Sequence, residues 1–153
     1  MLVGPGTCLW VDQVIGRDDP LWSDDVGRAA WWVGERWAAA LAEVGVARAV
    51  VWRGGMVPGK WSQRACFGGL APGEVTIGGS KVVGIAQRRT RAGALFQCAV
   101  TLGGEYPFGQ LAELQDLPAG EQAAMAADLA RTTVVLSADQ APSLVAALRN
   151  QLR

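Results

Sequence analysis

The chain has 153 residues, of which 50% are hydrophobic, and its fourteen basic residues balance its fourteen acidic ones. This size and hydrophobic content predict a single domain, residues 1–153, whose core needs no metal or disulfide. The zero net charge argues against nucleic acid or an anionic membrane surface as a partner.

The absence of histidine and the pattern of cysteines restrict the chemistry further. Without histidine the usual zinc ligand sets are incomplete, so no metal site is predicted, and a Ser-His or Cys-His pair cannot form. Cys8, Cys66 and Cys98 show no C-x-x-C spacing. Because neither a signal-peptide pattern nor an apolar run of membrane-spanning length is present, we expect a cytoplasmic protein with reduced thiols.

The first third of the chain predicts a strand, a helix and a second strand. Residues 8–15 alternate and are rich in β-forming types. Apolar residues then recur at spacings of three and four over 26–44, which predicts an amphipathic helix. Ser23 would cap the start of this helix, and Gly45 would end it. Residues 47–52 predict a short buried strand.

The middle of the chain predicts a hairpin and one further strand. Segments 74–77 and 81–86 are β-prone and flank Gly78-Gly79, which is a strong hairpin signal. Residues 88–93 predict a basic loop, and residues 94–102 predict the next strand.

The remainder of the chain is helical in pattern. Residues 119–131 are rich in alanine, and Ser137 with Gln140 predicts a capping box that opens a last helix. The order of elements is β-α-β, then three strands of antiparallel type, then helices. This order predicts an α/β (α+β) domain in which a mixed sheet is flanked by helices.

Two residues of the hairpin point to chemistry. Lys81 is one of only two lysines and opens a strand after a tight turn, where an ammonium group suits a phosphate, a carboxylate or a developing oxyanion. Gly84 interrupts an apolar strand, which weakens the strand unless a ligand or another backbone approaches there. We expect Lys81 to lie close to the thiol of Cys66. The alternative is a solvated lysine at the end of a hairpin.

The run from Gly79 to Arg88 reads Gly-Ser-Lys-Val-Val-Gly-Ile-Ala-Gln-Arg. It resembles the G-[RK]-K-[IV]-[SV]-G-[SI]-A-Q-R motif of the lipoate–protein ligase and octanoyltransferase family, whose fold is shared with biotin protein ligases. Cys66-Phe67, followed by Pro72 and Glu74-Val75, resembles the element that precedes this motif in some members. Residues 62–102 carry the specificity of the resemblance.

The resemblance implies an enzyme that moves an octanoyl or lipoyl group to a lysine of a small carrier domain. Lys81 would meet the acyl carbonyl or an acyl-adenylate phosphate, and Cys66 would form an acyl thioester in the octanoyltransferase branch. A ligase would use lipoate with ATP and Mg²⁺, whereas a transferase would use an octanoyl thioester; the partner would be a lipoyl carrier domain or an acyl carrier protein. The implied substrate-binding residues are Gly79, Ser80, Gly84, Ala86, Gln87, Arg88 and Gln97.

The chain also departs from the family pattern. The family's Arg-Arg-x-Gly-Gly-Gly loop would lie before Val3-Gly4-Pro5-Gly6, and the family's histidine positions fall on Val3 and on Gln97-Cys98. Two interpretations therefore stay open: a truncated form of a longer enzyme, or a degenerate relative that serves as a non-catalytic binding or scaffold module. A truncated sheet would expose apolar surface, so we expect a homo-oligomer formed through that surface.

Individual residues also keep alternative interpretations. Cys66 could be a small buried hydrophobe rather than a nucleophile, and Cys8 and Cys98 are expected in the core. Arg88, Arg89 and Arg91 could contact phosphate or an acidic carrier, or could form a solvated loop.

Overall fold

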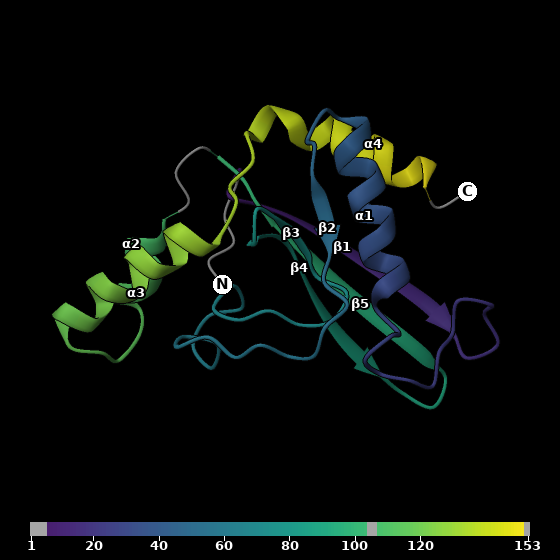
Figure 1. Cartoon of the computed structure of the whole chain (residues 1–153), viewed down its shortest axis with the longest axis horizontal. Helices are drawn as coiled ribbons and strands as arrows, with labels where there is room; N and C mark the ends of the chain where they lie inside the picture. The colour runs from purple at the N-terminus through teal and green to yellow at the C-terminus, as the bar shows by residue number, and fades with distance from the viewer. Residues whose placement is uncertain (1–5, 104–106, 152–153) are drawn as a thin grey trace.

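The computed structural model describes residues 6–103 and 107–151, so the expectations at Val3, Gly4 and Pro5 lie outside the described residues. Figure 1 shows α1 and α4 together above the sheet, and α2 and α3 side by side near its other end. In chain order the elements are β1 (Cys8–Gly16), α1 (Trp31–Glu43), β2 (Ala49–Val51), β3 (Val75–Ile77), β4 (Ser80–Arg89), β5 (Gly93–Thr101), α2 (Phe108–Glu113), α3 (Ala119–Thr132), the 3₁₀ turn η1 (Ala138–Gln140) and α4 (Ala141–Asn150).

The strands form one sheet in the order β1-β5-β4-β3-β2, and each neighbouring pair is antiparallel. Two isolated parallel bridges, Lys81 with Thr133 and Leu102 with Leu136, attach the segment after α3 to the sheet. Since helices flank the sheet, the predicted α+β class is confirmed. The ladders themselves are antiparallel, and among the described residues the parallel pairing that a mixed sheet requires is limited to these two bridges.

The predicted hairpin is confirmed at its turn and extended at its far end. Gly78 and Gly79 have φ angles of +59° and +87°, as a two-residue turn with both central residues left-handed requires. The following strand β4 continues to Arg89, because Arg88 and Arg89 stay in register with β5. The basic loop predicted over 88–93 is therefore shorter than expected.

The first helix begins later than its apolar periodicity predicts. α1 starts at Trp31 rather than near residue 26, and its start has no side-chain cap. Asp25, not Ser23, takes the capping role in a separate turn, where its carboxylate accepts two backbone N–H hydrogen bonds of 2.9 and 3.3 Å. The end of the helix is as predicted, since Gly45 has φ +83°.

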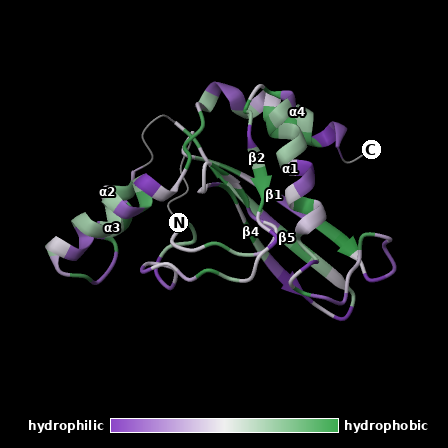
Figure 2. Ribbon diagram, viewed as in Figure 1, coloured by the Kyte–Doolittle hydropathy of each residue, from purple (hydrophilic) through white to green (hydrophobic). Residues whose placement is uncertain are grey.

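One face of the sheet is covered closely by α1 and α4, and we name it the covered face. Side chains alternate along a strand, so Phe96 and Cys98 of β5 both point to this side. Phe96 is fully buried and meets the ring of Trp32 edge-on at 5.3 Å. Leu144 of α4 joins the same core. Figure 2 shows hydrophobic colour where α1 and α4 meet the strands.

The opposite face is covered over only part of its length. Trp61, Phe67, Ala99 and Met125 form a second buried cluster, which joins the loop after β2 to the sheet and to the α2–α3 pair. The indole N–H of Trp61 donates a 2.9 Å hydrogen bond to Asp128 of α3. These contacts fix the loop that carries Cys66 against the end of the sheet where Lys81 lies.

The predicted C-terminal helices are confirmed. α3 covers the alanine-rich segment, and Ser137 and Gln140 form the predicted capping box before α4. Within residues 6–103 and 107–151, no helix has the length and apolarity that a membrane crossing requires.

Candidate functional site

A β-bulge in the hairpin directs the side chain of Lys81. Val75 pairs with Val83 whereas Thr76 pairs with Lys81, so β4 contains one extra residue, Val82, at this point. A bulge interrupts the strict alternation of side chains and can re-aim one of them. Lys81 consequently lies beneath the loop that carries Cys66 instead of projecting into solvent.

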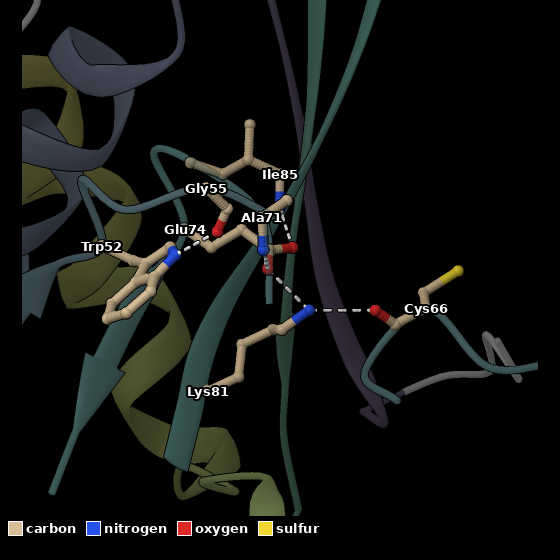
Figure 3. Close-up of polar contacts among 7 residues, drawn as sticks. All are labelled: Trp52, Gly55, Cys66, Ala71, Glu74, Lys81 and Ile85. Carbon is tan, nitrogen blue, oxygen red and sulfur yellow. Dashed lines mark hydrogen bonds and ion pairs between the residues drawn. The ribbon is translucent and has the colours of Figure 1, made fainter. Parts of the chain in front are cut away.

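The ammonium group of Lys81 is buried in an ion pair (Figure 3). Its Nζ lies 2.7 Å from Oε2 of Glu74, and the two side chains are 4% and 6% exposed. The carboxylate of Glu74 also accepts hydrogen bonds from the backbone N–H of Ala71 at 2.7 Å and of Ile85 at 3.1 Å. Burial raises the pKa of Glu74 above its ordinary value, and the attraction of Lys81 opposes that rise without cancelling it.

Lys81 contacts the backbone of Cys66 rather than its thiol. Nζ donates a 3.0 Å hydrogen bond to the carbonyl oxygen of Cys66, and Figure 3 shows the sulfur pointing away from the ammonium group. The expectation that Lys81 lies against the thiol is therefore wrong. Lys81 instead ties the Cys66 loop to β4, and the thiol itself is exposed.

Two clefts flank this arrangement and share the side chain of Phe67. The first, which we name the lysine cleft, has a volume of about 230 Å³. Lys81 and Gly79 line it together with Leu70, Val57 and the loop glycines. The Nζ of Lys81 lies 5.3 Å from the centre of the Phe67 ring, and Phe67 also lines the second opening.

The second opening, which we name the cysteine cleft, has a volume of about 200 Å³ and lies on the less covered face of the sheet. Three strands form its floor, because Gly84 pairs with Ala99 and Ala99 pairs with Trp10. The lining residues are Trp10, Cys66, Phe67, Glu74, Gly84, Ile85, Ala86, Gln97 and Ala99. A cleft of mainly apolar walls with an exposed thiol at its rim suits an apolar molecule with a reactive end.

The structure brings some of the predicted site residues together and separates others. Cys66, Gly84, Ala86 and Gln97 share the cysteine cleft, whereas Lys81 and Gly79 line the lysine cleft. The hydroxyl of Ser80 donates to the backbone oxygen of Arg131 at 3.2 Å and lines neither cleft.

Gln87 and Arg88 lie apart from both clefts. Gln87 pairs with Phe96 on the covered face, so it lies on the opposite side of the sheet from the cysteine cleft, and its expected role in substrate binding stays a prediction. Arg88 is on the cleft's face of the sheet but near the far end of β4, beside Leu95 and Val14 in a separate groove.

The three thiols differ in access and acidity. Cys98 is fully buried beneath α1, and burial raises the pKa of its thiol from 9.0 to about 11. Burial also raises the pKa of Cys8, which is half-buried. Cys66 is exposed, so the alternative in which it is a small buried hydrophobe does not hold, whereas Cys98 lies in the core as expected.

Sequence reasoning missed the partners that define the site. Glu74 was noted as part of a motif, but its pairing with Lys81 was not predicted. The pairing could have been inferred from the position of Glu74, which comes directly before the apolar strand β3. A carboxylate buried at such a position needs a partner of opposite charge. Trp10 was assigned to a strand only, and its place in the cleft depends on the pairing of β1 with β5.

One cation in the lining of the clefts could meet a phosphate of ATP. Among residues 6–103 and 107–151, Lys81 is the only cation that lines either cleft, and it is ion-paired with Glu74. Within the described part of the chain, no group of three or more His, Cys, Asp or Glu side chains is placed to hold a metal ion. A phosphate bound here would compete with Glu74 for the charge of Lys81.

Comparison with known proteins gives a limited likeness. No family model matches the chain, and no curated protein matches its sequence. Two solved structures of a "putative lipoate protein ligase" from T. acidophilum, one with bound lipoic acid, are similar at a TM-score of 0.45. Sequence identity is 12% and 13%, and the match covers 94% of this chain but 60% of the length of each matched chain.

Proposed function

We propose that this protein binds a medium-chain acyl group in the cysteine cleft and passes it, through a thioester on Cys66, to a lysine of a small carrier protein. The proposal is supported by one arrangement above all. The exposed thiol of Cys66 stands at the rim of an apolar cleft whose floor is made of the small residues Gly84 and Ala86. The resemblance of residues 62–102 to octanoyltransferases and lipoate ligases agrees with this reading.

The size of the cleft suits a short apolar chain. An enclosed apolar cavity of about 150 Å³ is enough to hold a molecule of benzene. The cysteine cleft has about 200 Å³, so an extended octanoyl chain would occupy it with little room for a branched or bulky group. Because Gly84 carries no side chain, the acyl chain can lie directly on the backbone of β4.

The proposed reaction has two steps. The thiolate of Cys66 attacks the carbonyl carbon of an octanoyl thioester, a new carbon–sulfur bond forms, and the donor thiol leaves with a proton. The amine of the carrier lysine then attacks the enzyme thioester, an amide bond forms, and the thiol of Cys66 is regenerated. Lys81 serves here as a positioning residue, since it holds the carbonyl of Cys66.

The transferase route is preferred to the ligase route because it needs no nucleotide. The ligase route would use ATP and Mg²⁺, and its acyl-adenylate would need the positive charge of Lys81, which Glu74 already neutralises. The same buried ion pair also favours a second candidate, a binding or scaffold module that holds an acyl group without transferring it.

Intact-mass spectrometry separates these candidates. After incubation with an octanoyl carrier protein, we expect the wild-type protein to gain the mass of one octanoyl group. The Cys8→Ser variant should show the same gain, whereas the Cys66→Ser variant should show none. If octanoate raises the melting temperature but no adduct forms, the binding module is the correct reading. An acyl-AMP that forms with lipoate, ATP and Mg²⁺ and survives Cys66→Ser would support the ligase route. If no adduct, adenylate or thermal shift is observed, the acyl proposal is wrong.

A further inference from the structure

Part of one sheet face is left uncovered by the described residues, although it carries large apolar side chains. On strand β1, Trp10 is 45% exposed and Val14 is 74% exposed. The buried cluster around Phe67 and Ala99 covers this face only at the other end of the sheet. Water-exposed apolar groups on a sheet face mark an interaction site when they are contiguous.

The strand register shows that the exposed groups are contiguous. Asp12, Gln97 and Ala86 lie side by side in one row across β1, β5 and β4. Val14, Leu95 and Arg88 form the next row. We name this surface, with Trp10, the open face; its residues are Trp10, Asp12, Val14, Ala86, Arg88, Leu95 and Gln97.

The open face carries one exposed charge of each sign, and the two do not pair with each other. Asp12 accepts a 2.8 Å hydrogen bond from the indole N–H of Trp10, and within the described residues neither Asp12 nor Arg88 makes an ion pair. They stand on opposite sides of β5, one row apart. Figure 2 shows a hydrophilic end on β4, and Arg88 and Arg89 are the last two residues of this strand.

This pattern is complementary to itself. A two-fold axis that runs parallel to the sheet, above Leu95 and Gln97, would place Asp12 of each copy over Arg88 of the other copy. The apolar side chains Val14 and Leu95 would then pack between two ion pairs. A partner with a purely acidic or a purely basic surface would satisfy only one of the two charges, so a second copy matches the open face better than either.

We propose that the open face is the contact surface of a homodimer in which two sheets pack face to face. The patch contains fewer residues than the about 20–30 per partner of a standard interface. The dimer is accordingly weak and forms with increasing concentration. This inference does not depend on the acyl chemistry, although Trp10, Ala86 and Gln97 also line the cysteine cleft, so that a bound second copy would cover part of its opening.

A charge exchange tests the pairing directly. Sedimentation velocity of the whole chain over about 10–500 µM is expected to show a monomer–dimer equilibrium. In Asp12→Arg and in Arg88→Asp, positions 12 and 88 carry the same charge, so both contacts of the symmetric dimer become repulsive. Each variant should therefore raise the dissociation constant of the dimer by about tenfold or more. The double variant D12R/R88D restores opposite charges and should recover association. Asp139→Arg, at the start of η1, changes an exposed charge away from the open face and should have no effect.

The outcomes discriminate clearly. A protein that stays monomeric at all concentrations overturns the proposal. A dimer that persists in both single variants also overturns it, because its contact would then lie elsewhere, for example along the edge strand β1. Association that is lost in the single variants but not recovered in the double variant contradicts the proposed pairing. Circular dichroism melts of each variant verify that the chain remains folded, and Val14→Lys provides a second disruption that leaves both charges in place.

Discussion

The two faces of the sheet differ in what covers them, and the difference separates stability from function. On the covered face, the rings of Phe96 and Trp37 are fully buried between the strands and the helices. On the other face, the covering loop is held by a buried ion pair and leaves a cleft and a bare apolar surface. The first face has the packing of a core, whereas the second face has the exposed thiol, the cleft and the free charges.

The largest difference between the faces should be seen in truncations. Phe96→Ala removes a fully buried ring from the covered face, and we expect a loss of about 3–5 kcal/mol of unfolding free energy. Val14→Ala on the open face should change it by less than about 0.5 kcal/mol, because that side chain is mostly in water. Urea denaturation of the two variants measures both values. Equal losses would contradict the division between a packed face and an open one.

The next largest loss of unfolding free energy is expected when the ion pair between Lys81 and Glu74 is broken. Lys81→Met leaves the carboxylate of Glu74 buried without its cation, and we expect a loss of about 3–4 kcal/mol. Part of the charge remains compensated by the N–H groups of Ala71 and Ile85, which keeps the loss from being larger. Glu74→Gln combined with Lys81→Met removes both charges, so the double variant should be more stable than Lys81→Met alone. If urea denaturation shows that the double variant loses as much free energy of unfolding as Glu74→Gln and Lys81→Met lose together, the two charges are not coupled.

These effects indicate what the sequence could predict. The hairpin at Gly78-Gly79 and the capping box at Ser137 follow from local backbone requirements, and both are confirmed. The late start of α1 could not be derived from apolar periodicity, because the competing turn is set by hydrogen bonds to the side chain of Asp25.

The site was predictable only in part for a related reason. The alternation of side chains along β4 already separates Gly84 and Ala86 from Gln87, so the placement of Gln87 on the other face could have been derived from the sequence. The direction of Lys81 could not, because it depends on a bulge whose extra residue is visible only once β3 and β4 are paired. The pairing of Lys81 with Glu74 depends on the same register.

A pH titration should sharpen the description of the covered face. Because burial raises the pKa of Cys98 to about 11 from its ordinary value of 9.0, the folded state keeps this proton when the unfolded state has lost it. Its contribution to stability is present below about pH 9 and is lost as the pH rises toward 11, by about 2–3 kcal/mol in total. The contribution of Cys98 is measured by comparing the unfolding free energies of the wild type and of Cys98→Ala from pH 8 to 10.5. A slope that is identical in the two proteins would show that Cys98 does not cause it.

The smallest change tests the cleft without disturbing the fold. A Cβ atom added at Gly84 would lie 3.5 Å from ring carbons of Phe67 and 3.7 Å from Glu74, which are ordinary contact distances. Gly84→Ala should therefore fold and should be stabilised by up to about 0.5–1 kcal/mol, since alanine loses less backbone entropy than glycine. Its methyl group would nevertheless occupy the floor of the cysteine cleft and weaken octanoyl binding. Gly79→Ala is the matched control, because φ +87° at that turn should make it less stable while the floor of the cysteine cleft stays unchanged. Calorimetric titration with octanoate and thermal melts of both variants separate the two effects. If Gly84→Ala binds octanoate as the wild type does, the acyl chain does not lie on β4, and the glycine in this strand has no role in the cleft.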